Sequence, residues 1–149
     1  MNAIQFIKDH GVEKAREVVE GAPKNAQRYL DGMYFKQGEW TWFWSLTVSK
    51  WLQYEKHIYS TSRFDFAVDL SDLKRLVESL DLVELLGGIE LLKRKIDGKH
   101  IGYTHFSING NGRWSFLDHY IDFIPDSAYH IGMVNKAIAD YESIGGEHV

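Results

Sequence analysis

A strictly alternating segment lies at Trp40–Ser49, with the sequence WTWFWSLTVS. Tryptophan, leucine or valine occupies every second position, and four of the five residues between them are small hydroxyl residues. Successive side chains of a strand point to opposite faces of a sheet, so this pattern predicts a strand with one apolar face. A helix that gathers the aromatic residues up to Trp51 is the competing interpretation. The aromatic and threonine-rich composition favours the strand.

Two hairpins are expected in the chain. Residues 58–68 alternate again, and a loop at Tyr54–His57 would join them to the first strand as an antiparallel pair. Two Asn-Gly steps at Asn109–Gly112 separate residues 100–108 from residues 113–116. Asn and Gly tolerate the positive φ of a tight turn, so we expect the second hairpin there.

Apolar residues recur at helical spacing in five other stretches, which predicts helices there. These stretches are residues 4–10, 12–19, 72–86, 89–96 and 131–141. Gly11 separates the first two helices, while Ser71 and Ser127 are the expected N-caps of the central helix and the last one. Residues 24–33 are compatible with one or two further helical turns.

These elements predict an α+β fold, in which an antiparallel sheet of about four strands, made of two hairpins, packs with N-terminal, central and C-terminal helices. A chain of 149 residues has the usual size of one domain, so residues 1–149 are expected to form a single α+β domain. The two prolines and thirteen glycines, with 44% apolar and 26% charged residues, argue against a long disordered region.

Composition argues against several classes of protein. The chain has no cysteine, which removes disulfides, thiol catalysis and cysteine-ligated metal sites. No basic stretch followed by an apolar run marks a targeting signal, and no segment approaches the ~18 apolar residues of a membrane span, so we expect a cytoplasmic protein. The formal net charge of −4 argues against non-specific binding to nucleic acid, which depends on a basic surface.

Histidine and carboxylate are the only metal-ligand set available, and they gather in the C-terminal third of the chain. A metal-dependent hydrolase built on His105, His119 and Asp122 is one hypothesis, but no known ligand spacing is reproduced, and we expect no metal and no cofactor. No G-x-S-x-G elbow, P-loop or complete G-x-G-x-x-G is present, so no catalytic residue is predicted and the chain is interpreted as a non-enzyme. The histidines and carboxylates that gather in the C-terminal third are His100, His105, His119 and His130 with Asp118, Asp122 and Asp126.

Aromatic residues make up 14% of the chain, and such residues dominate both cores and binding hot spots. The row of tryptophans from Trp40 to Trp44 is more simply explained as a core face beneath the helices than as a base-stacking surface, since no Lys or Arg lies between Glu39 and Ser49. The exposed members of one aromatic set are expected to anchor a protein partner. That set is Trp40, Trp42, Trp51, Tyr54, Tyr59 and Trp114.

Basic residues indicate an alternative function, that of a nucleic-acid-binding accessory protein. The run Lys93–Lys95 ends a short predicted helix, where positive charge interacts favourably with the helix dipole, and such a run is usually a solvated face. Nucleic acid is therefore the less favoured partner. The contributing residues would be Lys74, Arg75, Lys93, Arg94, Lys95 and Arg113.

Two parts of the sequence resemble small accessory proteins of tailed phages and prophages of enteric bacteria. The first is Val68–Ser79, VDLSDLKRLVES, which continues to Leu85–Ile89, and the second is the N-terminal stretch Phe6–Gly11 with Ala15–Val19 and Ala22-Pro23. Together these parts cover about a third of the chain. The resemblance implies a phage-derived protein of the bacterial cytoplasm, with no catalytic motif to carry over.

Accessory proteins of this kind often bind and block a host factor, such as a nuclease or a CRISPR complex. The resemblance, the aromatic excess and the lack of catalytic motifs together favour a non-enzymatic interaction protein that modulates a host protein or complex. An anti-defence inhibitor would be one form of it, and a homodimer is compatible with the sequence.

Overall fold

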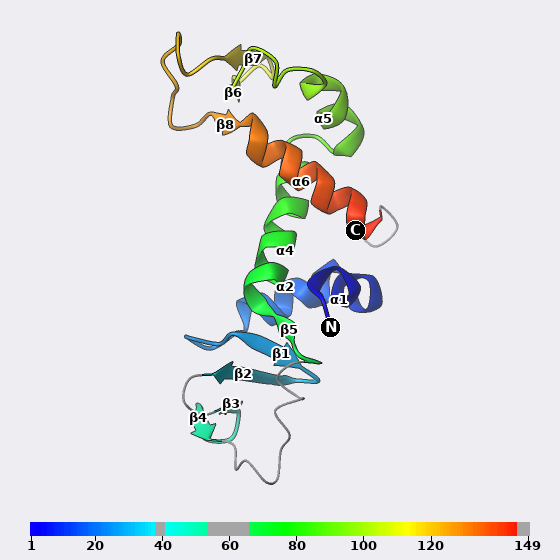
Figure 1. Cartoon of the computed structure of the whole chain (residues 1–149), viewed down its shortest axis with the longest axis vertical. Helices are drawn as coiled ribbons and strands as arrows, with labels where there is room; N and C mark the ends of the chain where they lie inside the picture. Colours follow the sequence, from blue (N-terminus) through cyan, green and yellow to red (C-terminus); the bar gives the residue numbers. More distant parts are fainter. Residues whose placement is uncertain (38–40, 54–65, 146–149) are drawn as a thin grey trace. The chain divides into compact units, whose positions relative to one another are not determined.

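The fold comes from a computed structural model, which describes residues 1–37, 41–53 and 66–145. In this part of the chain, five helices and two antiparallel sheets give the α+β fold that the sequence predicts (Figure 1). None of the described helices combines the length and the apolar character needed to cross a membrane.

Contacts divide the chain into two compact units. The first comprises Met1–Val77 with Ile144–Val149, and the second comprises Glu78–Ser143. The boundary falls inside one helix, α4, at Leu70–Leu85. The single domain expected over residues 1–149 stays a prediction.

The first unit opens with two helices, α1 at Ala3–His10 and α2 at Val12–Glu20. Gly11 separates them, as predicted, and its φ of +87° is a conformation that L side chains rarely adopt. The Asn2 side chain caps α1 by accepting a hydrogen bond from the Gln5 amide at 2.7 Å.

The first unit also contains a five-stranded antiparallel sheet with the order β4-β3-β2-β1-β5 (Figure 1). Strands β1 and β2 form a hairpin that turns at Asp31 and Gly32, whose φ angles are +47° and +85°. The helical turns considered for residues 24–33 are therefore wrong, because an Asp-Gly step with positive φ at both residues is typical of a two-residue hairpin turn. The strands are β1 Arg28–Leu30, β2 Met33–Gln37, β3 Thr41–Ser45, β4 Lys50–Gln53 and β5 Val68–Asp69.

The tryptophan-rich strand is shorter than predicted. Strand β3 ends at Ser45, and β4 returns antiparallel after a turn at residues 46–49, in which Ser49 has a φ of +50°. This turn contains no Gly, Pro or Asn, so the alternating pattern continues through it without the usual sequence marker. The loop predicted at residues 54–57 and most of the strand predicted at 58–68 lie outside the described residues, whereas β5 pairs with β1.

The two faces of this sheet differ in burial. Phe35 is fully buried and pairs with Phe43 across β2 and β3. Trp44 pairs with Trp51 across β3 and β4, and the alternation of the strands places these rings with Trp42 on the opposite face. All three tryptophans are half-buried, so they form neither a closed core nor a fully exposed row.

The second unit combines a three-stranded antiparallel sheet, in the order β7-β6-β8, with helices from the central and C-terminal parts of the chain. Phe106 on the middle strand is fully buried and lies in the apolar core formed by all these elements. The buried core residues are Val83, Leu86, Leu92, Ile96, Phe106, Ile131, Val134 and Ala137. The elements are the C-terminal half of α4 with α5 Ile89–Ile96, β6 His105–Ile108, β7 Trp114–Leu117, β8 Tyr129–His130 and α6 Ile131–Ile144.

The hairpin predicted around residues 109–112 is confirmed by β6 and β7. Asn109 fixes its turn, since the side-chain oxygen accepts hydrogen bonds from the amides of Asn111 and Arg113, each at 2.9 Å. The helices predicted at residues 72–86, 89–96 and 131–141 are also present, as α4, α5 and α6.

Both N-caps predicted as serines are wrong. Helix α4 begins two residues earlier than expected and is capped by Asp69, while α6 begins at Ile131, too far from Ser127 for capping. The residue before α6 is His130, whose Nδ1 accepts a hydrogen bond from the Gly132 amide at 3.0 Å. In both cases a short strand runs directly into the helix, so the last strand residue provides the cap.

Candidate functional site

The most exposed large apolar side chains in the described part of the chain lie between β7 and β8. Tyr120 and Ile121 are each 83% exposed, and Phe123 is 88% exposed. Residues 118–128, which carry them, are here called the apolar loop. Large apolar side chains exposed together are typical of surfaces that bind another molecule.

Hydrogen bonds define the backbone of the apolar loop. The Asp118 carboxylate accepts from the Tyr120 amide at 3.1 Å, and the Asp122 carboxylate accepts from the Asp118 amide at 2.8 Å. The Asp118 carbonyl also accepts from the amides of Ile121 and Asp122, at 3.0 and 2.7 Å. The exposed side chains are therefore presented by a turn with internal hydrogen bonds.

Thr104 ties this turn to the three-stranded sheet. Its hydroxyl accepts a hydrogen bond from the His119 amide at 3.0 Å, and its own amide donates to the Leu117 carbonyl at 2.9 Å. On the other side of the loop, the Ile131 amide donates to the Thr104 carbonyl at 2.9 Å. One residue before β6 thus holds both ends of the apolar loop.

Three histidines lie at the base of the apolar loop. The His105 and His130 rings, opposite each other on β6 and β8, have centroids 4.9 Å apart. Burial lowers the pKa of His105, and the neighbouring His130 and His119 lower it further. The ring of His119 also lies against that of Tyr120, with centroids 3.8 Å apart. This cluster favours uncharged imidazole at His105.

The exposed side chains of the apolar loop could contribute hydrophobic contacts to a partner. Covering each of its large side chains would contribute about 1.5–3 kcal/mol. The carboxylates of Asp118, Asp122 and Asp126 surround these side chains along the chain. Negative charge repels phosphate groups, which is unfavourable for contact with nucleic acid or an anionic lipid surface.

The predicted aromatic anchors occupy half-buried positions where they are described. Trp51 donates from Nε1 to the Lys24 carbonyl at 3.3 Å. The Lys36 ammonium lies 4.7 Å from the centroid of Trp51 and 5.6 Å from that of Trp42, which brings these two anchors together. The other predicted anchors Trp40, Tyr54 and Tyr59 lie outside the described residues.

Trp114 belongs to the second unit and has a packing role. Its ring stacks on Phe106, with centroids 4.8 Å apart and an interplanar angle of 16°. It also packs against the apolar core of the second unit. Its role as a partner anchor stays a prediction.

The basic residues of the alternative function fall in both units. Lys74 and Arg75 lie on α4 in the first unit, and Arg113 lies in the second. The second unit also holds the run Lys93–Lys95 on α5, where consecutive residues point in different directions. Lys93 forms an ion pair with Glu142, with Nζ and Oε1 2.5 Å apart. Two of the six residues thus belong to the first unit and four to the second.

The histidine and carboxylate hypothesis finds no matching geometry. Among residues 1–37, 41–53 and 66–145, no three His, Asp or Glu side chains are placed to hold a metal ion. The Nδ1 atom of His105 lies 2.8 Å from the Thr104 hydroxyl, and the Asp122 carboxylate is engaged by the Asp118 amide. These residues therefore form hydrogen bonds within the apolar loop and with the neighbouring Thr104.

Sequence reasoning missed the apolar loop because residues 116–124 have mixed periodicity. Their apolar residues fit neither the strand nor the helix pattern. Without a clear period, the sequence does not predict which of these side chains are buried and which are exposed. The available signal was the combination of Tyr120, Ile121 and Phe123 with acidic residues on both sides and Pro125 after them.

Comparison with other proteins adds no family. No protein-family model, no curated protein and no solved structure matches this chain. The resemblance to phage accessory proteins stays a prediction, and the function is inferred from the geometry above.

Proposed function

We propose that this chain is a non-enzymatic interaction protein that docks on another protein through the apolar loop. One observation carries the proposal: Tyr120, Ile121 and Phe123 are 83–88% exposed on a backbone that is held by its own hydrogen bonds. A preformed loop loses less conformational entropy on binding than a flexible one, which leaves more of the apolar contact energy for affinity.

The chemistry of the loop defines the surface it fits. Apolar side chains at its centre need an apolar depression, and the acidic residues around them favour Lys or Arg at the rim of that depression. The resemblance to phage accessory proteins points to a host protein or complex, such as a nuclease or a CRISPR complex, as the partner. Blocking that partner would make the chain an anti-defence inhibitor.

The proposal is tested by affinity capture from a bacterial host lysate with two forms of the tagged chain. One form is unchanged, and the other carries Tyr120→Ser, Ile121→Ser and Phe123→Ser. A protein recovered in stoichiometric amount by the first form should be lost with the second. Hot-spot side chains cost at least about 2 kcal/mol each when truncated, which is more than tenfold in affinity.

The matched control is a chain with Leu46→Ser and Leu85→Ser, which are 77% and 72% exposed outside the loop. It should retain the partner, and circular dichroism should show that all three forms are folded. Equal capture by the loop variant would contradict the proposal. Capture that disappears on nuclease treatment of the lysate would instead favour the nucleic-acid alternative.

A further inference from the structure

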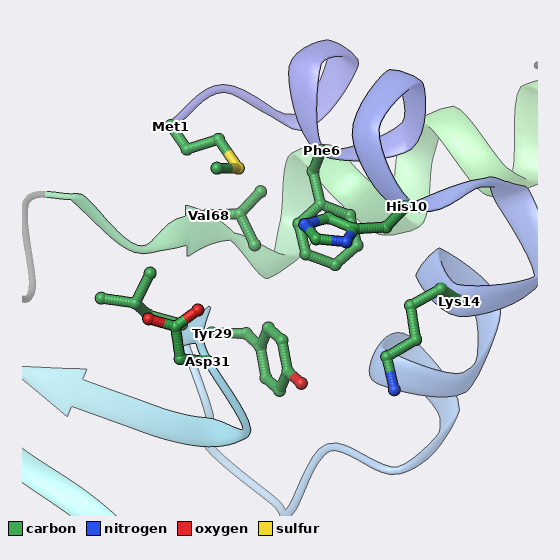
Figure 2. Close-up of a pocket in the computed structure, with 8 residues that line it drawn as sticks. Met1, Phe6, His10, Lys14, Tyr29, Asp31 and Val68 are labelled. Atoms are coloured by element: carbon green, nitrogen blue, oxygen red, sulfur yellow. The ribbon is translucent and has the colours of Figure 1, made fainter.

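The first unit contains a pocket that the apolar loop does not involve. It lies between α1, α2, the turn of the β1–β2 hairpin and β5, and its volume is about 80 Å³ (Figure 2). Phe6 and Val68 are buried at its base, and the half-buried Tyr29 and Leu30 complete the apolar wall. The rings of Phe6 and Tyr29 meet edge to face, with centroids 6.1 Å apart.

The size of the pocket selects the group it can take. A cavity of ~150 Å³ lined by apolar side chains accepts benzene. The pocket here has about half that volume, and its wall is apolar. It therefore suits an aliphatic side chain of a few carbons better than a full aromatic ring.

Charged residues stand at the rim of the pocket and differ in sign. Figure 2 shows Asp31 and Lys14 on opposite sides of Tyr29, with His10 above the Phe6 ring. The Lys14 ammonium has one exposed partner, Glu17, at 3.5 Å. Such a surface pair contributes little, so Lys14 remains able to meet a further carboxylate. Within the described part of the chain, no hydrogen bond or ion pair occupies the carboxylate of Asp31.

We propose that this pocket binds an extended peptide segment of a partner protein through one aliphatic anchor side chain, with an acidic residue on the Lys14 side and a basic residue on the Asp31 side. The opposite charges at the two sides of the mouth match a segment with opposite charges at its two ends. In an extended peptide, residues two apart point to the same side, so the three side chains share one face of the peptide. The inference takes from the proposed function only that the chain binds a protein.

The test uses acetylated, amidated pentapeptides and NMR titration of the full chain. The probes are Glu-Gly-Leu-Gly-Lys and its reverse, Lys-Gly-Leu-Gly-Glu, because the direction of the bound chain is open. One of them should shift the signals of Val68 and Leu30 and saturate with a Kd of about 1 mM or tighter. Replacing Leu by Ala should weaken binding at least about tenfold, because it removes three buried carbons. Equal binding of the Ala peptide, or no saturable shift with either direction, would overturn the proposal.

Variants of the rim test the charge assignment. Asp31→Asn keeps a residue that tolerates positive φ, and Lys14→Gln keeps an exposed helical side chain, so both should fold. Each substitution should weaken binding of the tighter-binding peptide by at least about threefold. This loss of affinity should vanish when the peptide residue of opposite charge is replaced by a neutral one. Lys8→Gln, on an exposed residue of α1 outside the pocket, is the matched control and should leave the Kd unchanged. Equal effects of all three substitutions would rule out the assignment.

The apolar-loop variant separates this inference from the proposed function. A chain with Tyr120→Ser, Ile121→Ser and Phe123→Ser should keep its peptide affinity, because the pocket belongs to the other unit. Loss of peptide binding in that variant would count against an independent pocket. Retention of the captured host protein by the same variant would refute the loop proposal and leave the pocket proposal standing.

Discussion

Asp69 and Ser71 form a paired cap at the start of α4. The Asp69 carboxylate accepts hydrogen bonds from the Ser71 hydroxyl at 2.5 Å and from the Ser71 amide at 2.9 Å. The Asp72 amide donates to the same oxygen at 3.1 Å. Two backbone donors in the first helical turn are thereby satisfied by one side chain.

Replacing this cap should destabilise the chain. We expect Asp69→Ala to lower the free energy of unfolding by about 0.5–2 kcal/mol at pH 7, as for other N-caps. Burial alone would raise the pKa of Asp69, but hydrogen bonds from Ser71 and Asp72, with the charge of Arg28, lower it on balance. A carboxylate with a lowered pKa stabilises the fold above its unfolded pKa of about 3.9 and loses this contribution as the pH falls through its folded pKa.

Urea unfolding at pH 7 and pH 3 checks both statements. The difference between the unchanged chain and Asp69→Asn should be larger at pH 7 than at pH 3, because the contribution of a carboxylate with a lowered pKa declines once the pH falls below its unfolded pKa. Asp126→Asn, on an exposed loop residue, is the control and should have a small effect at both pH values. A pH-independent difference for Asp69→Asn would show that the charge has no role in the cap.

Short sequence patterns correctly predicted the helices and turns that depend on residues close together in the chain. The break at Gly11, the turn at Asn109–Gly112 and the apolar spacing of α5 each depend on residues close in the sequence. The caps were misplaced because a strand leads directly into each helix, and sequence spacing does not show where the strand ends. The separation of the strands into two sheets depends on pairings such as that of β1 with β5, which join residues about forty positions apart.

The His105 and His130 pair should make stability depend on pH. Burial, then His130 and His119, lower the pKa of His105, so its stabilising contribution is complete above the unfolded pKa of about 6.5. It is lost as the pH falls from there through the folded pKa of His105, because the charged form of this ring is less favourable in the folded protein than in the unfolded chain. Unfolding measured from pH 7.5 to pH 5 should show a decline that is smaller in His105→Gln.

The exposed His100 provides the comparison for that experiment. His100→Gln replaces another histidine of the same unit without touching the pair, and the decline between pH 7.5 and pH 5 should persist. An identical pH profile for His105→Gln and the unchanged chain would contradict the assigned role. NMR of the imidazole protons should place the pKa of His105 below that of an unfolded chain.

The hydroxyl of Tyr34 joins the sheet of the first unit to α2. It donates to the Val18 carbonyl at 2.6 Å, and burial, followed by the nearby Tyr29, raises the pKa of Tyr34. We expect Tyr34→Phe to lower the free energy of unfolding by about 0.5–1.5 kcal/mol, the usual contribution of one hydrogen bond. Tyr29→Phe is the matched control, and chemical denaturation of both variants should show the larger loss at Tyr34. A larger loss at Tyr29 would be inconsistent with this bond.

The high aromatic content predicted that aromatic residues contribute to the core or to a binding surface. It did not predict which aromatic residue belongs to which. A tryptophan is equally suited to a core and to a hot spot, and the sequence of β3 and β7 does not show what covers each face. Trp114 stacks on the buried Phe106, while the exposed aromatic residues Tyr120 and Phe123 follow in an irregular segment. Burial depends on tertiary packing, which local periodicity does not determine.

Trp114 and Tyr120 can be assigned to packing and to binding by one comparison. Trp114→Ala should lower the free energy of unfolding by about 3 kcal/mol or less, since the ring is half-buried and a fully buried aromatic residue costs about 3–5 kcal/mol. Tyr120→Ala, at 83% exposure, should change stability by no more than about 0.5 kcal/mol. Affinity for the captured partner, corrected for the folded fraction, should fall for Tyr120→Ala and stay constant for Trp114→Ala. The reverse result would make Trp114 the anchor and the loop dispensable.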